Sequence, residues 1–142
     1  MSVEENKVVI RRIVEEVWNA GNTALIPELP GTDYVKRSPG GDELRGLESV
    51  ARVMGALRAA FPDFRMEIEN LFGEGDQLAY QLRTHGTFLG KFRDIEPTGK
   101  SFTTRVSIIA RFDNRKVVEE FEYMTEPSFL EQVGIAWRPR RQ

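Results

Sequence analysis

The stretch from Phe61 to Phe121 decides the fold, because it is extended chain that reverses direction three times. Apolar and polar residues alternate in FPDFRMEIENLF (61–72), QLAYQLRTHGTF (77–88), SFTTRVSIIARF (101–112) and VVEEFEYMT (117–125), and the turns come from GEGD (73–76), PTGK (97–100) and DNRK (113–116). Alternation with a period of two is typical of strands that are buried on one face. The stretch therefore predicts four consecutive antiparallel strands.

Helical patterns flank this sheet. Apolar residues at three- and four-residue spacing predict helices over residues 3–19, 23–28, 47–60 and 127–133. Ser2 with Glu5 fits a capping box at the start of the first helix, and Asn22 suits the N-cap of the second. The order predicts an α+β fold, in which a strongly curved antiparallel sheet forms a cone that the N-terminal helices close around an internal pocket.

Length and composition set the bounds of this interpretation. A chain of 142 residues predicts one domain over 1–142, with a basic tail at about 138–142. A net charge of −2 gives no basic footprint for nucleic acid, and no apolar run is long enough to span a membrane. Cysteine is absent, and the first residues lack the apolar core of a secretory signal, so we expect a cytoplasmic protein.

Strand alternation predicts which side chains face the helices. The expected inward set includes Tyr80 in the second long strand, and Phe121 and Tyr123 in the fourth. Glu120 and Glu122 then point outward, toward arginines of neighbouring strands, as cross-strand charge pairs. The outer face, with balanced charges and a few apolar residues, suits a homodimer packed through the sheet.

Several segments, taken in order, resemble the SnoaL-like polyketide cyclases of the nuclear transport factor superfamily. The resemblance runs from about Glu5 to Gly134 and is carried by ENKVVIRRIVEEVWNAGN, DYV with SPGG and ELRGLESV, LRAAFPDFRMEIENLFGEGDQ, PTGKSF, and RFDNRKVVEEFEY with FLEQVG. It implies an α+β cone, a deep apolar pocket, a dimer or tetramer, and in many members a reaction without a cofactor. The best-known members close a ring of a polyketide by an intramolecular aldol step.

Three positions depart from the pattern that the resemblance implies. The family places an Asp at the end of the last strand, where this chain has Thr125. A His often found in a G-T-H-T-G stretch is replaced here by Phe88 in GTFLG, and another His after the DYV segment is replaced by Arg37. An aldol-type step needs a base next to the carbonyl carbon and a donor for the enolate oxygen, so the base is left open.

The candidate catalytic residues are Asp33, Arg37 and Thr125, and the candidate substrate-binding residues are Trp18, Tyr34, Met54, Tyr80, Phe88 and Tyr123. Asp33 would serve as the base if its side chain turned inward, and Arg37 would hold an anionic oxygen. Each has a structural alternative: Arg37 as an exposed loop residue, the tyrosines and Trp18 as core residues. The single histidine, His85, is expected on the outer face, and no cluster of metal ligands is present in the sequence.

Two functions remain open at this point. One is a cofactor-free enzyme of the cyclase or isomerase type that acts on a bulky, apolar, oxygenated small molecule. The other is a non-catalytic module that binds such a molecule or serves in an assembly. A buried carboxylate that touches the cavity would favour the enzyme, whereas a cavity lined only by apolar groups, Tyr and Thr would favour the binder.

Overall fold

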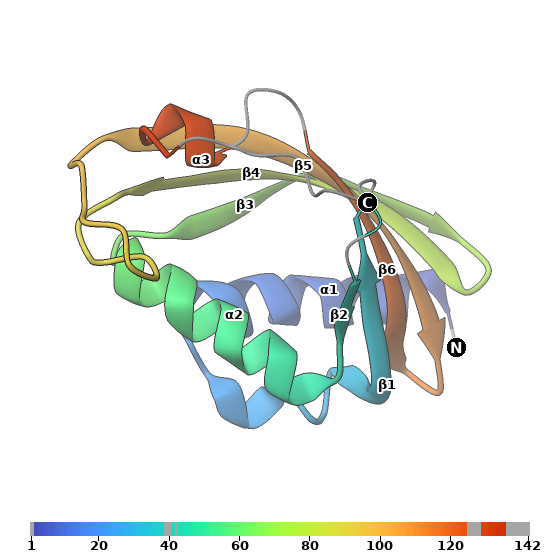
Figure 1. Cartoon of the computed structure of the whole chain (residues 1–142). Helices are drawn as coiled ribbons and strands as arrows, with labels where there is room; N and C mark the ends of the chain where they lie inside the picture. The colour runs from blue at the N-terminus through green and yellow to red at the C-terminus, as the bar shows by residue number, and fades with distance from the viewer. Residues whose placement is uncertain (1, 39–40, 42, 125–128, 136–142) are drawn as a thin grey trace.

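The computed structural model describes residues 2–38, 41, 43–124 and 129–135. A long sheet curves over two N-terminal helical segments, and α1 and α2 lie beneath its hollow side (Figure 1). The elements follow in the order α1 (Val3–Arg12), η1 (Ile13–Asn19), η2 (Thr23–Leu25), β1 (Pro30–Arg37), β2 (Glu43–Arg45), α2 (Leu47–Ala60), β3 (Arg65–Glu74), β4 (Gln77–Thr87), β5 (Ser101–Asp113), β6 (Lys116–Met124) and α3 (Phe129–Gln132). The predicted α+β architecture with a curved sheet is confirmed.

The sheet has six strands in the order β2-β1-β6-β5-β4-β3. β3, β4, β5 and β6 form the predicted antiparallel meander, while β1 lies parallel to β6 and brings Lys36 beside Glu120. The parallel pair was not predicted, because β2, α2, β3, β4 and β5 all lie between its two strands in the sequence. It matters for function, since it sets side chains of β1 next to those of β6.

The first helix begins as the sequence predicts. The Ser2 hydroxyl accepts the Glu5 backbone N–H at 3.1 Å, and the Glu5 carboxylate accepts the Ser2 N–H at 3.4 Å, which completes the capping box. From Ile13 to Asn19 the helix widens to π-helical geometry, a rarity often found at functional sites. The widened part carries Trp18 toward the sheet.

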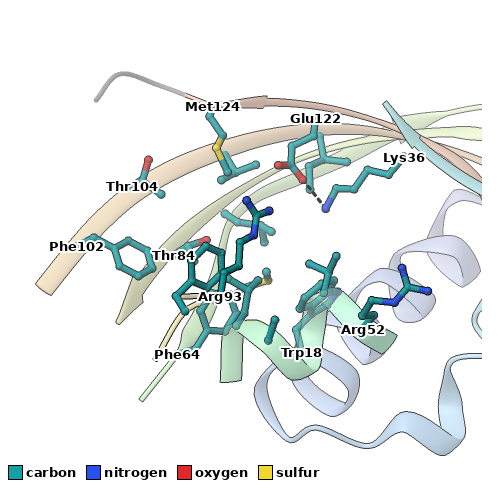
Figure 2. Close-up of a pocket in the computed structure, with 18 residues that line it drawn as sticks. Trp18, Lys36, Arg52, Phe64, Thr84, Arg93, Phe102, Thr104, Glu122 and Met124 are labelled. Carbon is teal, nitrogen blue, oxygen red and sulfur yellow. Dashed lines mark ion pairs between the residues drawn. The ribbon is translucent and has the colours of Figure 1, made fainter. Parts of the chain in front are cut away.

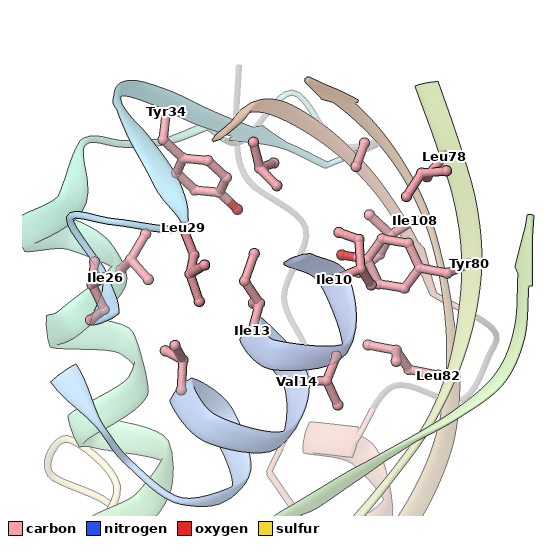
Figure 3. Packing of buried hydrophobic residues seen from close by; sticks show 14 of the residues in the cluster. Ile10, Ile13, Val14, Ile26, Leu29, Tyr34, Leu78, Tyr80, Leu82 and Ile108 are labelled. Carbon is pink, nitrogen blue, oxygen red and sulfur yellow. The ribbon is translucent and has the colours of Figure 1, made fainter. Parts of the chain in front are cut away.

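The main core lies between this helix and the middle of the sheet. Figure 3 shows Ile10 and Val14 on the side of the helix that faces β4, near Tyr80 and Leu82, and Ile13 on the side toward Leu29. Every second residue of β4 and of β5 is buried over most of their lengths, as the alternation predicts. Burial of each such side chain contributes about 1.5–3 kcal/mol, so this layer supplies much of the folding free energy.

A second, aromatic cluster closes the other end of the sheet. Phe61, Phe88 and Phe102 are buried together, with ring centroids 5.4 Å and 5.3 Å apart for the two pairs that include Phe61. Val133 adds to it from the end of α3, where the Gln132 side-chain oxygen accepts the Thr103 N–H at 2.9 Å. This cluster fixes the end of β4 and the loop that follows it.

The predicted facing of β6 is wrong beyond its first residues. Phe112 pairs with Val117 and Arg111 with Glu119, so Val118 is an extra residue in β6, a β-bulge. One inserted residue reverses the facing of every side chain that follows. Glu120 is consequently buried and Glu122 faces the hollow side, whereas Tyr123 is exposed.

The predicted cross-strand charge pairs change accordingly. Glu120 and Glu122 do not pair with arginines of the outer face. There Arg105 pairs with Glu69 at 3.0 Å and Arg111 with Glu119 at 3.3 Å, and both glutamates come from positions that the alternation had not selected. The prediction of an outer face with balanced charges holds, and Glu67 lies opposite Arg83 there as expected, but Glu69 and Glu119 take the places predicted for Glu120 and Glu122.

Candidate functional site

An apolar pocket of about 460 Å³ lies between the sheet and α2, and Figure 2 shows the residues that line it. Its walls come from η1, β1, α2, β3, β4, β5, β6 and the loop after β4. The lining residues are Trp18, Lys36, Arg52, Val53, Ala56, Leu57, Phe64, Met66, Leu82, Thr84, Phe92, Arg93, Phe102, Thr104, Val106, Ile108, Glu122 and Met124. A volume of this size suits a small organic molecule with more than one ring.

An ion pair forms one wall of the pocket. Lys36 of β1 and Glu122 of β6 are joined through Nζ and Oε2, and their side chains are only 17% and 15% exposed. The Lys36 Nζ also lies 5.6 Å from the centroid of the Trp18 ring, a cation–π contact. Figure 2 shows the pair at the end of the pocket away from Phe102. The pocket therefore holds a carboxylate and an ammonium side by side among apolar groups.

The charge of Lys36 is maintained by its surroundings. Burial alone would lower the pKa of this lysine, but the negative charges of Glu122 and Glu120 outweigh it, so the pKa is raised. Lys36 is consequently an ammonium at neutral pH, with three N–H donors.

A second carboxylate is buried behind the pair. Glu120 accepts a hydrogen bond from the Tyr34 hydroxyl at 2.6 Å and a second, short one from the Tyr80 hydroxyl. Burial first, and the charge of Glu120 second, raise the pKa of both tyrosines well above the usual value. Two phenol donors occupy both oxygens of Glu120, which marks it as a support for the pocket wall and leaves Glu122 as the carboxylate that faces the cavity.

Two threonine hydroxyls in the pocket wall have no partner. Thr84 of β4 and Thr104 of β5 are paired across the strands, and each side chain is about 5% exposed. Neither Oγ1 atom has a hydrogen-bond partner among the described residues. A buried hydroxyl without a partner costs about 1–3 kcal/mol, so these two groups are suited to an oxygen or nitrogen atom of a bound molecule.

The loop after β4 places a cation at the pocket. A two-residue turn joins Phe92 and Ile95, whose N–H and C=O groups bond to each other at 2.9 and 3.0 Å. Arg93 occupies the first turn position with a φ of 54°, a left-handed conformation that favours glycine. Figure 2 draws its guanidinium extending over the pocket.

Comparison with known proteins assigns the chain to a family. The sequence profile of the SnoaL-like polyketide cyclase family matches residues 8–133. The chain belongs to this family. A search of curated protein sequences gave no match.

Solved structures support the same fold for this SnoaL-like protein. AclR of Streptomyces galilaeus, described as "a putative hydroxylase", is 26% identical with a TM-score of 0.80 over 94% of this chain and 83% of its own. IdmH of Streptomyces antibioticus, described as "a putative polyketide cyclase", is 24% identical, with a TM-score of 0.77 over 92% and 99%. A "putative SnoaL-like polyketide cyclase" from Jannaschia sp. CCS1 is 19% identical, with a TM-score of 0.82 over 94% of both chains.

The structure brings some of the predicted binding residues to the pocket and places others behind it. Trp18 lines the pocket. Tyr34, Met54 and Tyr80 are buried in the main core outside the lining, and Phe88 is buried in the aromatic cluster. The two tyrosines still bear on the site, because they hold Glu120 beside Lys36.

The predicted catalytic residues do not converge on the pocket. Asp33 is exposed, and Arg37 is paired with Glu119 at 3.0 Å and with Glu43. The hydrogen bond from Arg37 lowers the pKa of Glu119, which is typical of a structural ion pair. Tyr123 is 48% exposed on the outer face. Thr125 lies outside the described residues.

The sequence interpretation missed Lys36 and Glu122. Lys36 was visible as the only lysine in a short extended segment, but nothing in the sequence revealed its parallel pairing with β6. Glu122 was considered and assigned to the outer face, because the bulge at Val118 has no glycine to mark it.

No group of three or more His, Asp or Glu side chains is arranged to hold a metal ion in the part of the chain that the structure describes. None of the helices in the described ranges is both long and apolar enough to cross a bilayer. His85 lies outside the pocket, 3.5 Å from Glu67.

Proposed function

We propose that this SnoaL-like protein is a cofactor-free enzyme that removes a proton from the carbon next to a carbonyl group. Its substrate would be a bulky, mainly apolar, oxygenated small molecule such as a polyketide. One observation carries the proposal: the carboxylate of Glu122 and the ammonium of Lys36 share a wall of an apolar pocket. A base and an enolate-stabilising cation are the two groups that this reaction requires.

The proposed roles follow from the geometry. A Glu122 oxygen accepts the proton from the carbon, and the electron pair of the broken C–H bond moves to the carbonyl oxygen. Lys36 donates an N–H to that oxygen as its negative charge develops. The enolate carbon then attacks a second carbonyl, as in an aldol closure, or regains the proton at another position, as in an isomerisation.

The surrounding residues suit an apolar, oxygenated guest. Trp18 lies beside the ion pair and offers a face for stacking, while Phe64 and Phe102 line the opposite part of the pocket. Thr84 and Thr104 offer hydroxyls to a further oxygen of the guest. The side chains of Lys36 and Glu122 are largely buried, so their charges act more strongly than they would in bulk water.

The proposed base differs from the one that the family resemblance suggests. The expected Asp position corresponds to Thr125, whereas Glu122 is three residues earlier in the sequence. The predicted roles of Asp33 and Arg37 give way to Glu122 and Lys36, because only the latter two line the pocket.

We also propose a homodimer through the outer face of the sheet, in the cytoplasm. Paired positions across four strands give a continuous apolar row of Phe72, Ala79, Ile109 and Phe121. Phe72 is 63% exposed and Ile109 41% exposed, and Tyr123 lies in the adjacent row. Exposed apolar side chains in one row are typical of an interface between proteins.

Deuterium exchange tests the enzymatic proposal without knowledge of the natural product. The protein is incubated in D₂O with 1-tetralone, a bicyclic ketone with exchangeable protons, and deuterium uptake is measured by mass spectrometry. We expect uptake above the buffer rate, reduced about 10²-fold or more in Glu122→Gln. Glu119→Gln, which changes a carboxylate of the outer face, is the matched control and should retain the rate.

The alternative function, binding without catalysis, gives a different result in the same experiment. It predicts that the ketone binds, as measured by quenching of Trp18 fluorescence in a Trp137→Phe background, while deuterium uptake stays at the buffer rate in every variant. Glu122 is a largely buried carboxylate that lines the pocket, and such a carboxylate favours the enzyme over the binding module.

A further inference from the structure

The pocket carries more positive than negative charge. Its described lining contains three cations, Lys36, Arg52 and Arg93, and one carboxylate, Glu122. Lys36 is paired with Glu122, whereas Arg52 and Arg93 form no ion pair with any residue that the structure describes. The chain as a whole has a net charge of −2, so this surplus is local to the pocket. Such a surplus attracts anions.

Arg93 is held at the pocket at some cost to the backbone. A φ of 54° in a residue other than glycine is unfavourable, by about 1–3 kcal/mol, and such conformations gather at ligand-binding sites. Glycine would fit this turn position better, yet the chain has an arginine there. Lys91 in the same turn region is paired with Glu96 at 3.5 Å, while the Arg93 guanidinium lies over the Phe92 ring, 5.2 Å from its centroid.

The loop that carries Arg93 is fixed at its base. The N–H groups of Leu89 and Gly90 both donate to the Ala60 carbonyl at 3.0 Å, at the end of α2. A Cβ atom on Gly90 would lie 2.1 Å from the Ala59 carbonyl oxygen, so only glycine permits this approach. The Phe88 N–H donates to the Lys100 carbonyl at 2.9 Å and closes the loop. Arg93 is thus positioned by the fold.

We propose that the guest of this pocket is an organic anion, an apolar ring system with a carboxylate that Arg93 binds at the edge of the pocket. The inference rests on the proposed function for the identity of the pocket and adds the charge of its ligand. A guanidinium offers two parallel N–H donors that match a carboxylate, and Arg52 adds a second positive charge on the α2 side. The unpartnered hydroxyls of Thr84 and Thr104 bind a neutral oxygen deeper in the same guest.

A matched pair of fluorescent probes tests this inference. Anthracene-2-carboxylate and anthracene-2-carboxamide have the same ring system and differ in charge. We expect the carboxylate to bind the unmodified protein about tenfold more tightly than the amide, as for one charge-assisted contact at a partly solvated site. The preference should fall as salt is raised.

Two glycine variants separate recognition from backbone effects. Arg93→Gly removes the guanidinium and relieves the left-handed conformation, so it should fold at least as stably and bind the two probes equally. Arg115→Gly relieves a similar φ of 65° in the β5–β6 turn, outside the pocket lining, and should keep the tenfold preference.

The outcomes distinguish this inference from the proposed function. Equal binding of both probes by the unmodified protein, or a preference that persists in Arg93→Gly, would overturn the anion inference while leaving the deuterium-exchange result intact. Binding of neither probe would contradict the pocket itself and this inference with it. If the unmodified protein shows no deuterium exchange above the buffer rate but still prefers the carboxylate probe, only the enzymatic proposal would be contradicted.

Discussion

Lys36 of β1 and Glu122 of β6 form an ion pair within the wall of an apolar pocket. The two residues are far apart in the sequence, and two features of the fold bring them together: the parallel pairing of β1 with β6 and the bulge at Val118. The charges stay in place because each compensates for the burial of the other. The pair is therefore a structural element of the pocket wall, and it is also the feature on which the proposed reaction depends.

Breaking the ion pair should destabilise the fold. Lys36→Met or Glu122→Leu alone leaves one charge largely buried without its partner, and we expect each to lower the free energy of unfolding by about 3 kcal/mol. The double variant should lose less than either single variant, as measured by urea denaturation. Lys91→Met is the control, because its pair with Glu96 is exposed and contributes only about 0–1 kcal/mol. Additive effects of the two substitutions would contradict the coupling.

Stability should fall at alkaline pH because of Tyr34 and Tyr80. The pKa of each is raised in the folded protein, so above the usual value of about 10 the unfolded chain releases protons that the native state keeps. The stabilisation is fully present below about pH 10 and is lost as pH rises through the raised values. Urea denaturation between about pH 8 and 11 measures this fall, which should be smaller in Tyr34→Phe/Tyr80→Phe. An equal fall in both proteins would show that the two tyrosines are not its source.

Removing the unpartnered hydroxyls should separate stability from binding. Thr84→Val and Thr104→Val replace a buried hydroxyl without a partner by a methyl group, so we expect the free energy of unfolding to stay the same or rise by about 1 kcal/mol. Binding of 4-hydroxy-1-tetralone, whose hydroxyl supplies the further oxygen, should weaken when followed by Trp18 fluorescence in the Trp137→Phe background, whereas binding of 1-tetralone, whose one oxygen lies at Lys36, should stay the same. Thr103→Val, at an exposed position of β5, is the control. A loss of stability without loss of binding would assign the hydroxyls to the fold.

The proposed dimer depends on the apolar row of the outer face. Ile109→Glu places a charge at the centre of that row and should convert a dimer into a monomer in native mass spectrometry. Val8→Glu introduces the same charge at an exposed site on α1 and should leave the assembly unchanged. A monomer in the unmodified protein at micromolar concentration would reject the dimer.

Most of the architecture was predictable because it depends on local pattern. The capping box at Ser2, the helix over 47–60 and the inward faces of β4 and β5 all follow from spacing that a few neighbouring residues define. The order of helices and strands predicts a curved sheet over helices, and such a sheet encloses a pocket. The widening of the first helix at Ile13 had no recognisable signal.

The site was less predictable, because non-local features determine it. Alternation continued through β6 assigns Tyr123 inward and Glu122 outward, and a single extra residue at Val118 reverses both. The sequence around Val118 contains neither glycine nor proline, so it gives no indication of the bulge. Asp33 is the candidate base in the sequence because the family's Asp position holds Thr125, while alternation assigns Glu122, which lines the pocket, to the other face.

A crystal structure of the protein with bound 1-tetralone tests the central claim most directly. We expect the ketone inside the pocket, with its carbonyl oxygen within hydrogen-bonding distance of Lys36 Nζ and its exchangeable carbon beside Glu122. A pocket filled by its own side chains, or a ketone bound with its carbonyl away from Lys36 and Glu122, would contradict the claim.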